Sequence, residues 1–403
     1  MKRRGFLKLA GALSTVGFAP EILWAAAPSA RSGNTQAKPI APRSVSGKTR
    51  RVVLIKLVGG NDGLSTLIPT RDKEYNLLRD KYRPNILHAK HQLQELPDSN
   101  GLALNPYMAP LQRWWKSGHV AWIQGVGYHH PILSHFRSSD IWETASNAFE
   151  YSDIGWLTQI LPRYKEGLHG IIIGEGLGPM LGKDCHTIAM QSPQVFLNQV
   201  DLIDDISPSR HPSQALTHIV NIQHQLHAAG KQLKQKMSHP KPLGGFATGT
   251  LGRQLESIAQ MIINDVDTAV YKIEHKGFDT HSKQLITQNH LLRELSVALD
   301  SFANAMQRHG RWDEVMVITY SEFGRRVAEN HGKGTDHGAA SVQLVMGGKV
   351  RGGIYGDRPP LHDLDKDGNL HMTTDFRKVY GTVASRWLGV ANPWRSQGIL
   401  PFV

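Results

Sequence analysis

The fold is decided by the stretch RVVLIKLVGGNDG at residues 51–63. Val52–Val58 is a short, mostly β-branched run that ends at two glycines, which predicts a buried strand. Gly59 and Gly60 let the backbone turn sharply, so that Asp62 is presented at the edge of the sheet. The simpler interpretation of this segment is an Asn-Asp-Gly turn.

Similar apolar runs recur along the chain and predict further strands at Val120–Gln124, Gly170–Gly174, Ala269–Ile273, Val315–Tyr320 and Val342–Met346. Helical patterns lie between them. One apolar stripe with alternating spacings of three and four comprises Leu292, Leu295, Leu299, Phe302 and Met306. Because this helix lies between two strands, it predicts a crossover β-α-β unit. A second helix is expected through Leu216–Met237. The whole pattern predicts a doubly wound α/β fold with a mostly parallel sheet, as a single domain over residues 51–403.

Composition excludes several classes of protein. The chain has 403 residues, of which 40% are hydrophobic and 20% are charged, which are values of a globular protein. A single cysteine excludes an intramolecular disulfide framework and any multi-cysteine metal centre. The net charge of +12 is not concentrated in a basic block, so it indicates solubility and attraction for anionic substrates. The lack of any recognisable binding module argues against a nucleic-acid function. No apolar run after residue 30 is long enough to cross a bilayer, so no transmembrane segment is expected in the mature chain.

The N-terminus is typical of an export signal. Residues 2–8 carry a paired arginine followed by Phe-Leu-Lys, then a moderately apolar stretch and a small-residue exit near Ala27. This form predicts a signal peptide over residues 1–27, recognition by the twin-arginine export machinery, and a periplasmic or otherwise exported location. The alternative is an anchoring N-terminal helix. Residues 28–50 are polar and rich in proline and serine, which predicts a linker.

Carboxylates and imidazoles follow the predicted strands at their carboxyl ends, where open α/β sheets place their chemistry. These candidate metal ligands are Asp62, Asp279, His281, Glu322, Asp336 and His337. Carboxylate plus imidazole is a ligand set for Zn, Mn or a related divalent ion such as Mg or Ca. Two carboxylates at about 4 Å repel by roughly 4 kcal/mol at an effective dielectric near 20. Several converging acids would therefore need a bound divalent metal or raised pKa values.

Other catalytic signatures are missing. The sequence has no Gly-x-Ser-x-Gly, His-Glu-x-x-His or Cys-x-x-Cys-His, which argues against the common serine hydrolases, zinc peptidases and c-type cytochromes. Gly174–Gly178 is followed by Pro179, which argues against a dinucleotide site. Cys185 lacks the sequence context of a formylglycine sulfatase and is interpreted as a buried small hydrophobe.

Five motifs stand in order along the chain: GGNDGLST at 59–66, SHFRSSDIWET at 134–144, GFDTH at 277–281, SEFGRR at 321–326 and GTDHG at 334–338. Together with the twin-arginine signal, they closely resemble the exported bacterial proteins of domain-of-unknown-function family 1501, over about residues 51–392. That family itself looks like a distant branch of the alkaline phosphatase, sulfatase and phosphoglycerate mutase superfamily. The resemblance implies an alkaline phosphatase-like α/β fold.

By this resemblance, Asp62 corresponds to the metal-binding aspartate after the first strand, and Asp279, His281 and His337 correspond to further ligands. Glu322 stands where relatives carry the aspartate of Asp-His-Gly, and Phe323 replaces the histidine of that motif. The motif at 134–144 corresponds to the helix start that carries the nucleophile in relatives. This implies Ser134 or Ser138 as nucleophile.

The implied function is metal-dependent hydrolysis of a phosphate or sulfate ester by a metal-activated serine. Arg325, Arg326 or Arg137 would grip the anionic oxygens of the substrate. The alternative is a non-catalytic periplasmic binding or assembly protein that retains the fold, which the phenylalanine in place of a histidine favours. A redox role has no cofactor motif to support it.

Overall fold

The computed structural model describes residues 49–165, 167–200, 213–238 and 243–403. The predicted signal peptide and nearly all of the predicted linker lie outside these residues, so those boundaries stay predictions. Within the described part of the chain, no helix combines the length and the apolar character that a bilayer span requires.

A nine-stranded sheet runs through the centre of the molecule, in the order β13-β5-β12-β9-β1-β8-β6-β7, with β14 paired to β5. Its strands are β1 (Arg51–Val58), β5 (Val120–Gly127), β6 (Gly170–Ile173), β7 (Thr187–Met190), β8 (Val270–Lys276), β9 (Val315–Tyr320), β12 (Ser341–Gly347), β13 (Gly353–Tyr355) and β14 (Thr374–Asp375). All neighbouring pairs are parallel except those of β12, which runs antiparallel to β5 and β9. The predicted α/β class with a mostly parallel sheet is confirmed.

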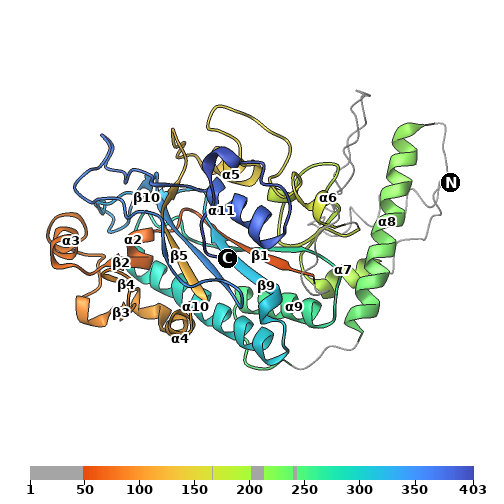
Figure 1. The fold of residues 1–403 in the computed structure, drawn as a ribbon, viewed down its shortest axis with the longest axis horizontal. Helices are drawn as coiled ribbons and strands as arrows, with labels where there is room; N and C mark the ends of the chain where they lie inside the picture. Colours follow the sequence, from red (N-terminus) through yellow and green to blue (C-terminus); the bar gives the residue numbers. More distant parts are fainter. Residues whose placement is uncertain (1–48, 166, 201–212, 239–242) are drawn as a thin grey trace.

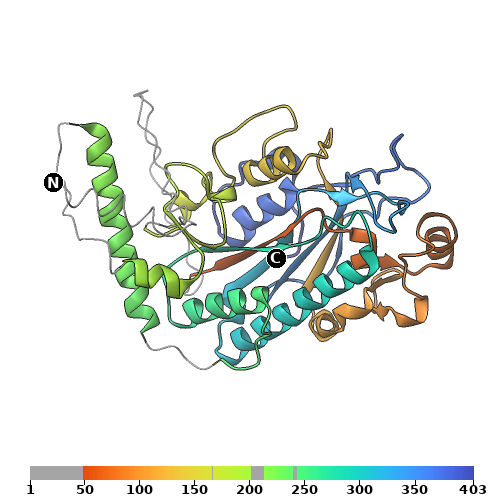
Figure 2. The same ribbon diagram turned by 180° about the vertical axis from the view of Figure 1, so that it is seen from behind.

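Helices cover both faces of this sheet (Figures 1 and 2). One face packs against α9 (Thr250–Ile263) and α10 (Gln284–Arg308), and the other against α5 (His135–Thr144) and α11 (Arg377–Thr382). The side chains of β1 alternate between the two apolar cores: Val53, Ile55 and Leu57 face α9 and α10, whereas Val52 and Leu54 face α5 and α11. The first strand is therefore buried on both sides, as its run of apolar residues predicts.

The predicted crossover is present. The chain leaves β8, forms α10 across one face, and returns as β9; both strands run parallel to β1 and flank it. The predicted apolar stripe of α10 is buried, with Leu292 and Leu299 fully inaccessible to solvent. The second predicted helix is α8 (Gln214–Met237), at one end of the molecule (Figure 1).

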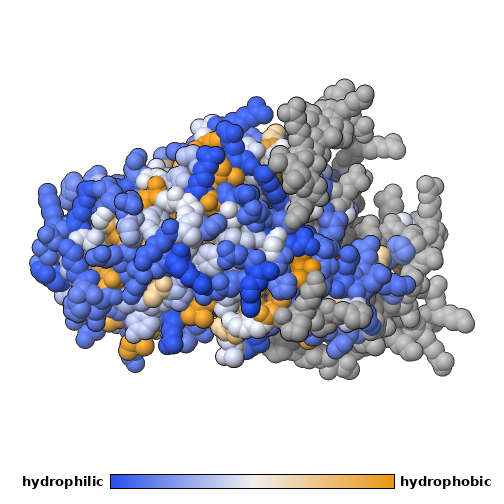
Figure 3. Space-filling view, turned by 60° about the horizontal axis from the view of Figure 1, so that its bottom comes forward, coloured by the Kyte–Doolittle hydropathy of each residue, from blue (hydrophilic) through white to orange (hydrophobic). Residues whose placement is uncertain are grey.

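The remaining elements surround this core. They are α2 (Gly63–Thr66), α3 (Asp72–Leu77), α4 (Gln112–Lys116), α6 (Leu161–Tyr164), α7 (Pro193–Val200), the small sheet of β2 (Leu67–Pro69), β3 (Gln94–Glu95) and β4 (Leu102–Leu104), and the pair β10 (Gly324–Arg325) with β11 (His337–Gly338). The face seen in Figure 3 is mostly hydrophilic with scattered apolar residues, as is usual for a protein surface in water.

Candidate functional site

The carboxyl ends of β1, β8 and β9 lie side by side, and the loops that follow them bring five of the six predicted ligands together. Asp279 and His281 follow β8, and Glu322 follows β9. Asp336 and His337 arrive on the strand pair β10–β11. The convergence that strand order predicts is therefore present for these five residues.

Asp279 is the centre of the cluster. Its Oδ1 lies 3.0 Å from His281 Nε2 and 3.2 Å from His337 Nε2, and its Oδ2 lies 3.5 Å from His135 Nε2. Arg325 donates a hydrogen bond of 2.7 Å to the same Oδ1. Burial opposes ionisation of this carboxyl, but the hydrogen bonds from Arg325 and His337 outweigh it and lower the pKa of Asp279 to about 2. Asp279 is therefore a carboxylate over the whole physiological pH range.

Glu322 orients the imidazole ring of His135. Its side chain is almost fully buried, and its Oε1 lies 2.9 Å from His135 Nδ1 and accepts a 2.8 Å hydrogen bond from the backbone N–H of Gly59. On the other side of the cluster, Asp336 Oδ1 lies 3.4 Å from His281 Nδ1. Two imidazoles of the cluster therefore each have a carboxylate behind them, an arrangement that fixes the ring and directs its other nitrogen towards Asp279.

Two glycines and a phenylalanine shape the floor of the cluster. Gly59 has a φ of +119°, and a Cβ added there would lie 2.3 Å from the backbone nitrogen of Asp279. A Cβ on Gly60 would lie 2.4 Å from the ring of Phe323. That ring stacks on His337 with centroids 4.2 Å apart. The turn predicted from the paired glycines is present: the close approach to Asp279 requires Gly59, and the close approach to Phe323 requires Gly60.

The donor set fits a divalent metal. Ligand atoms of His135, Asp279 and His337 all lie within 4.8 Å of one another. Two imidazoles and one carboxylate are a ligand set that zinc and other first-row metals accept. Bonds of about 2.0–2.1 Å in tetrahedral geometry put ligand atoms about 3.3 Å apart. His337 Nε2 lies 3.2 Å from Asp279 Oδ1 and His135 Nε2 lies 3.5 Å from Asp279 Oδ2, so each imidazole is near that spacing from a different oxygen of the carboxylate.

Asp62 does not join the cluster. Its carboxylate is fully buried and forms an ion pair of 2.6 Å with Arg83, whose side chain is equally inaccessible. Leu64 N–H, Ser65 Oγ and the Gln284 side-chain amide also donate to it. Burial opposes ionisation, but Arg83 lowers the pKa of Asp62. The predicted role of this residue as the first-strand metal ligand is revised, because its oxygens are already occupied and it anchors the turn instead.

Arg325 does not offer its guanidinium to a substrate. The side chain is buried, and its nitrogens donate to the backbone carbonyls of Gly60, Thr335 and Phe278 as well as to Asp279. The predicted grip on an anionic substrate is therefore revised to a positioning role. Arg325 ties the loops after β1 and β8 together and orients the Asp279 carboxylate.

The two predicted nucleophiles lie at the start of α5 in different surroundings. Ser138 is fully buried, and its hydroxyl lies 2.9 Å from that of Tyr128. Ser138 faces the core, whereas the next residue on the helix points about 100° away from it. Ser134 is the exposed N-cap residue of α5, without a side-chain capping bond. The structure thus separates Ser138 from the cluster.

His135 is not among the ligands predicted from the sequence, although it lies in the motif at 134–144 that carries the family resemblance. The available signal was an imidazole at the first residue of a helix that follows a predicted strand. An open cleft of about 700 Å³ extends from the cluster along the same face of the sheet. Its lining includes His135, Asp279 and Glu322, together with Lys56 and Ser139, and contains neither Ser134 nor Ser138.

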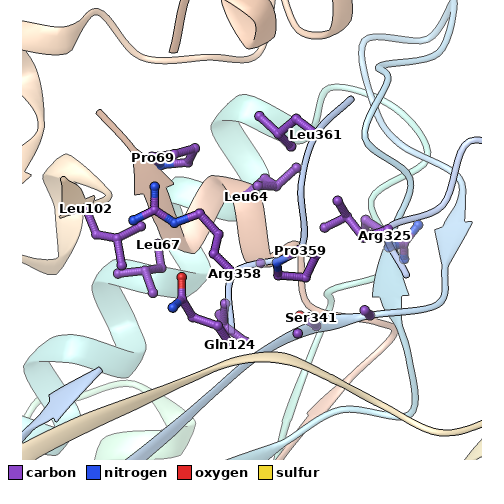
Figure 4. A pocket seen from close by; sticks show the side chains of 15 residues that line it. Leu64, Leu67, Pro69, Leu102, Gln124, Arg325, Ser341, Arg358, Pro359 and Leu361 are labelled. Atoms are coloured by element: carbon purple, nitrogen blue, oxygen red, sulfur yellow. The ribbon is translucent and has the colours of Figure 1, made fainter. Parts of the chain in front are cut away.

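A smaller cavity of about 40 Å³ lies on the other side of Arg325 (Figure 4). Most of the side chains around it are apolar, among them Leu64, Leu67 and Leu361. Arg358 at its edge is paired with Glu74 at 2.6 Å. This cavity has room for only a few waters and contains none of the clustered carboxylates or imidazoles. The wide cleft is the candidate substrate site because His135, Asp279 and Glu322 line it.

The family model described as a protein of unknown function (DUF1501) matches residues 223–400. This range contains three of the five motifs, at 277–281, 321–326 and 334–338, and confirms the family resemblance there. No curated protein matches the sequence.

Several solved structures resemble this chain. A protein of the alkaline phosphatase superfamily from Vibrio parahaemolyticus is 12% identical, with 97% of this chain and 76% of that chain covered and a TM-score of 0.39. A phosphonate monoester hydrolase from Silicibacter pomeroyi is 9% identical, with 87% and 75% covered and a TM-score of 0.43. A sulfatase from Pseudoalteromonas sp. is 11% identical, with 85% and 68% covered and a TM-score of 0.39.

Proposed function

We propose that this protein is an exported metal-dependent hydrolase of phosphate or sulfate esters. The observation that carries the proposal is the juxtaposition of His135, Asp279 and His337, whose ligand atoms lie within 4.8 Å of one another beside a cleft of about 700 Å³. The twin-arginine signal predicted at residues 1–27 supports a periplasmic location. That route carries proteins already folded in the cytoplasm, so a metal can be bound before export.

The residues of the cluster would have two roles, metal binding and orientation of the ligands. His135, Asp279 and His337 would hold the ion, and His281 lies close enough to the same Asp279 oxygen to complete the set. A divalent ion in this position supplies Lewis-acid stabilisation of the charge that develops on a phosphoryl or sulfuryl group. Glu322 keeps His135 oriented, so that the ring presents Nε2 to the site.

The proposal is tested by hydrolysis assays on p-nitrophenyl phosphate, bis-p-nitrophenyl phosphate and p-nitrophenyl sulfate, with Zn, Mn, Mg or Ca added separately. We expect turnover of at least one ester, its loss on chelation, and a decrease of at least 100-fold in His135→Ala. His129→Ala is the matched control, because His129 is exposed two residues after β5 and lies outside the cluster. A folded protein that hydrolyses none of these esters with any of the four metals refutes the proposal.

A non-catalytic binding or assembly protein is the second candidate. It is favoured by the ion pair of 2.7 Å between Arg325 and Asp279, which neutralises the central carboxylate without a metal. Phe323 in place of a histidine points in the same direction. A folded wild-type protein that hydrolyses none of these esters with any of the four metals would support this alternative.

A further inference from the structure

A row of polar side chains crosses three parallel strands under α5. Lys56 of β1 is in register with Glu274 of β8 on one side and with Tyr320 of β9 on the other. Lys56 follows Val52 and Leu54 by the two-residue alternation of a strand, so it lies on the face that α5 covers. These residues lie near the carboxyl ends of their strands, just before the loops that lead to the cluster.

Lys56 connects this row to α5. Its Nζ donates hydrogen bonds of 3.0 Å to Ser139 Oγ and 3.0 Å to Glu143 Oε1. Tyr320 donates a further hydrogen bond of 3.2 Å to the same Glu143 oxygen. Only 8% of Lys56 is exposed, so the ammonium has little water around it and depends on these partners.

Folding alone does not require such a row. A buried ion pair can usually be replaced by apolar residues of similar volume with little loss of stability, and often with a gain. The neighbouring strand repeats the arrangement, because Lys272 is almost fully buried and pairs with Glu274 at 3.0 Å. Two buried lysines beneath an open cleft therefore call for a chemical explanation.

Ser139 is the hydroxyl that meets both the row and the cleft. It lies four residues after His135 on α5, so the two side chains share one face of the helix, with Cβ atoms about 6 Å apart. Both line the wide cleft, together with Asp279 and Glu322. Ser139 is thus a serine in the cleft with a basic side chain at hydrogen-bond distance, which is the arrangement of an activated nucleophile.

We propose that Ser139 is the nucleophile of this cleft and that Lys56, backed by Glu143, activates its hydroxyl. The proposal rests on the hydrolase function proposed above and deepens it. Ser139 Oγ forms a bond to phosphorus or sulfur while the bond to the ester oxygen breaks. The ester oxygen leaves with that electron pair and takes a proton from water, which leaves hydroxide in the cleft.

Lys56 gives a proton to Glu143, and the amine so formed takes the proton of Ser139. In the second step the hydroxide attacks the covalent intermediate, the bond to Ser139 Oγ breaks, and the proton returns from Glu143 through Lys56. The sum is one water consumed, with one alcohol and one phosphate or sulfate released. The proton transfers among Ser139, Lys56 and Glu143 run along the two 3.0 Å contacts of Lys56.

The ionisable groups that face this serine come from four elements. Those that line the same cleft are His135, Asp140 and Glu143 of α5, Lys56 of β1, Glu274 and Lys276 of β8, and the loop residues Glu175, Asp279 and Glu322; Lys272 of β8 and Tyr320 of β9 contact Glu274 and Glu143. Lys56 is the cation in direct contact with Ser139. A thiol placed at this position should therefore ionise more readily than a free cysteine.

A cysteine substitution tests the activation without any substrate or metal. The single native cysteine, Cys185, is buried and provides a silent background. At pH 7 we expect the thiol of Ser139→Cys to react with iodoacetamide at least tenfold faster than that of Ser117→Cys, an exposed position whose hydroxyl donates to the backbone carbonyl of Trp114. Adding the charge-neutral pair Lys56→Gln and Glu143→Gln should remove that advantage. A rate equal to that of Ser117→Cys, or one unchanged in the triple variant, overturns the proposal.

Hydrolysis then separates this proposal from the one it rests on. We expect Ser139→Ala to lose at least 1,000-fold in ester turnover with its metal content unchanged, whereas Ser134→Ala stays within threefold. An active Ser139→Ala enzyme, or an inactive Ser134→Ala enzyme, overturns the assignment and leaves the hydrolase function standing. A wild-type protein without turnover refutes the hydrolase function, and the thiol rates still decide whether Lys56 activates position 139.

Discussion

Replacing Asp62 by asparagine distinguishes an anchoring role from a metal-binding role for this residue. The two side chains have nearly the same volume, so the substitution leaves no cavity. It removes the negative charge from a pair in which neither partner is accessible to solvent. The Arg83 guanidinium would then remain buried with only neutral acceptors, among them the carbonyl oxygens of Val327 and Arg326 at 2.7 and 2.9 Å.

The size of the effect follows from that geometry. Removing one partner of a buried ion pair costs about 3–5 kcal/mol, because the other charge is left uncompensated. Since two carbonyl oxygens and the Ser65 hydroxyl still accept hydrogen bonds from Arg83, we expect the lower end, about 3 kcal/mol. Urea denaturation of the two proteins at pH 7 measures this difference.

The difference should also depend on pH in a defined direction. The pKa of Asp62 is lowered in the folded protein, so its contribution to stability is present above the unfolded value near 3.8 and is lost as pH falls below it. The wild type should therefore approach the variant in stability as the pH is lowered through 4 towards the native pKa.

Asp72→Asn serves as the control, because its ion pair with Lys90 is exposed and should shift the urea midpoint far less. Metal content provides the second readout. If the folded Asp62→Asn variant keeps its stability within about 1 kcal/mol but loses bound metal, the buried-pair account is refuted and Asp62 is a ligand after all.

Three further outcomes follow from the same structure. Gly60 has φ at +88°, and a Cβ added there would meet the ring of Phe323, so Gly60→Ala should lower the free energy of unfolding by roughly 2–4 kcal/mol. In Gly118→Ala the added Cβ meets nothing within 4 Å, so that loss should be about 1 kcal/mol. Thermal denaturation measures both values. Trp156→Ala should cost about 3–5 kcal/mol in denaturant titrations, since the indole is buried and stacks on Tyr380 with centroids 4.0 Å apart. Because the pKa of Asp279 is lowered to about 2, its carboxylate stabilises the folded state above pH 4; acid titration of Asp279→Asn should show a smaller loss of stability between pH 4 and 2, and an unchanged slope would contradict the contacts described.

The architecture could be predicted from the sequence because its signals are local. The β-branched run at Val52–Val58 and the stripe through Leu292 and Leu299 identify a buried strand and an amphipathic helix from residue types alone. The edge of the sheet at which Asp279 and Glu322 meet follows from strand direction. Both lie where the strand ends predict them.

The details of the site required the three-dimensional structure, since they depend on contacts between distant segments. Nothing near Asp62 in the sequence shows that Arg83 will occupy its carboxylate. Ser138 and Ser139 are neighbours in sequence, yet one faces the core and the other faces the cleft, because a helix separates them by about 100°. An uncertainty of one residue in helix phase is therefore enough to decide whether a serine of this helix is assigned to the core or to the cleft.

Metal analysis of the purified protein tests the central claim most directly. Wild-type protein loaded with Zn or Mn and then freed of excess ion should retain at least one equivalent per chain. His135→Ala and His337→Ala should each lose it, whereas His129→Ala should keep it. Equal retention in all four proteins, or none in the wild type, would contradict the claim that His135, Asp279 and His337 form a metal site.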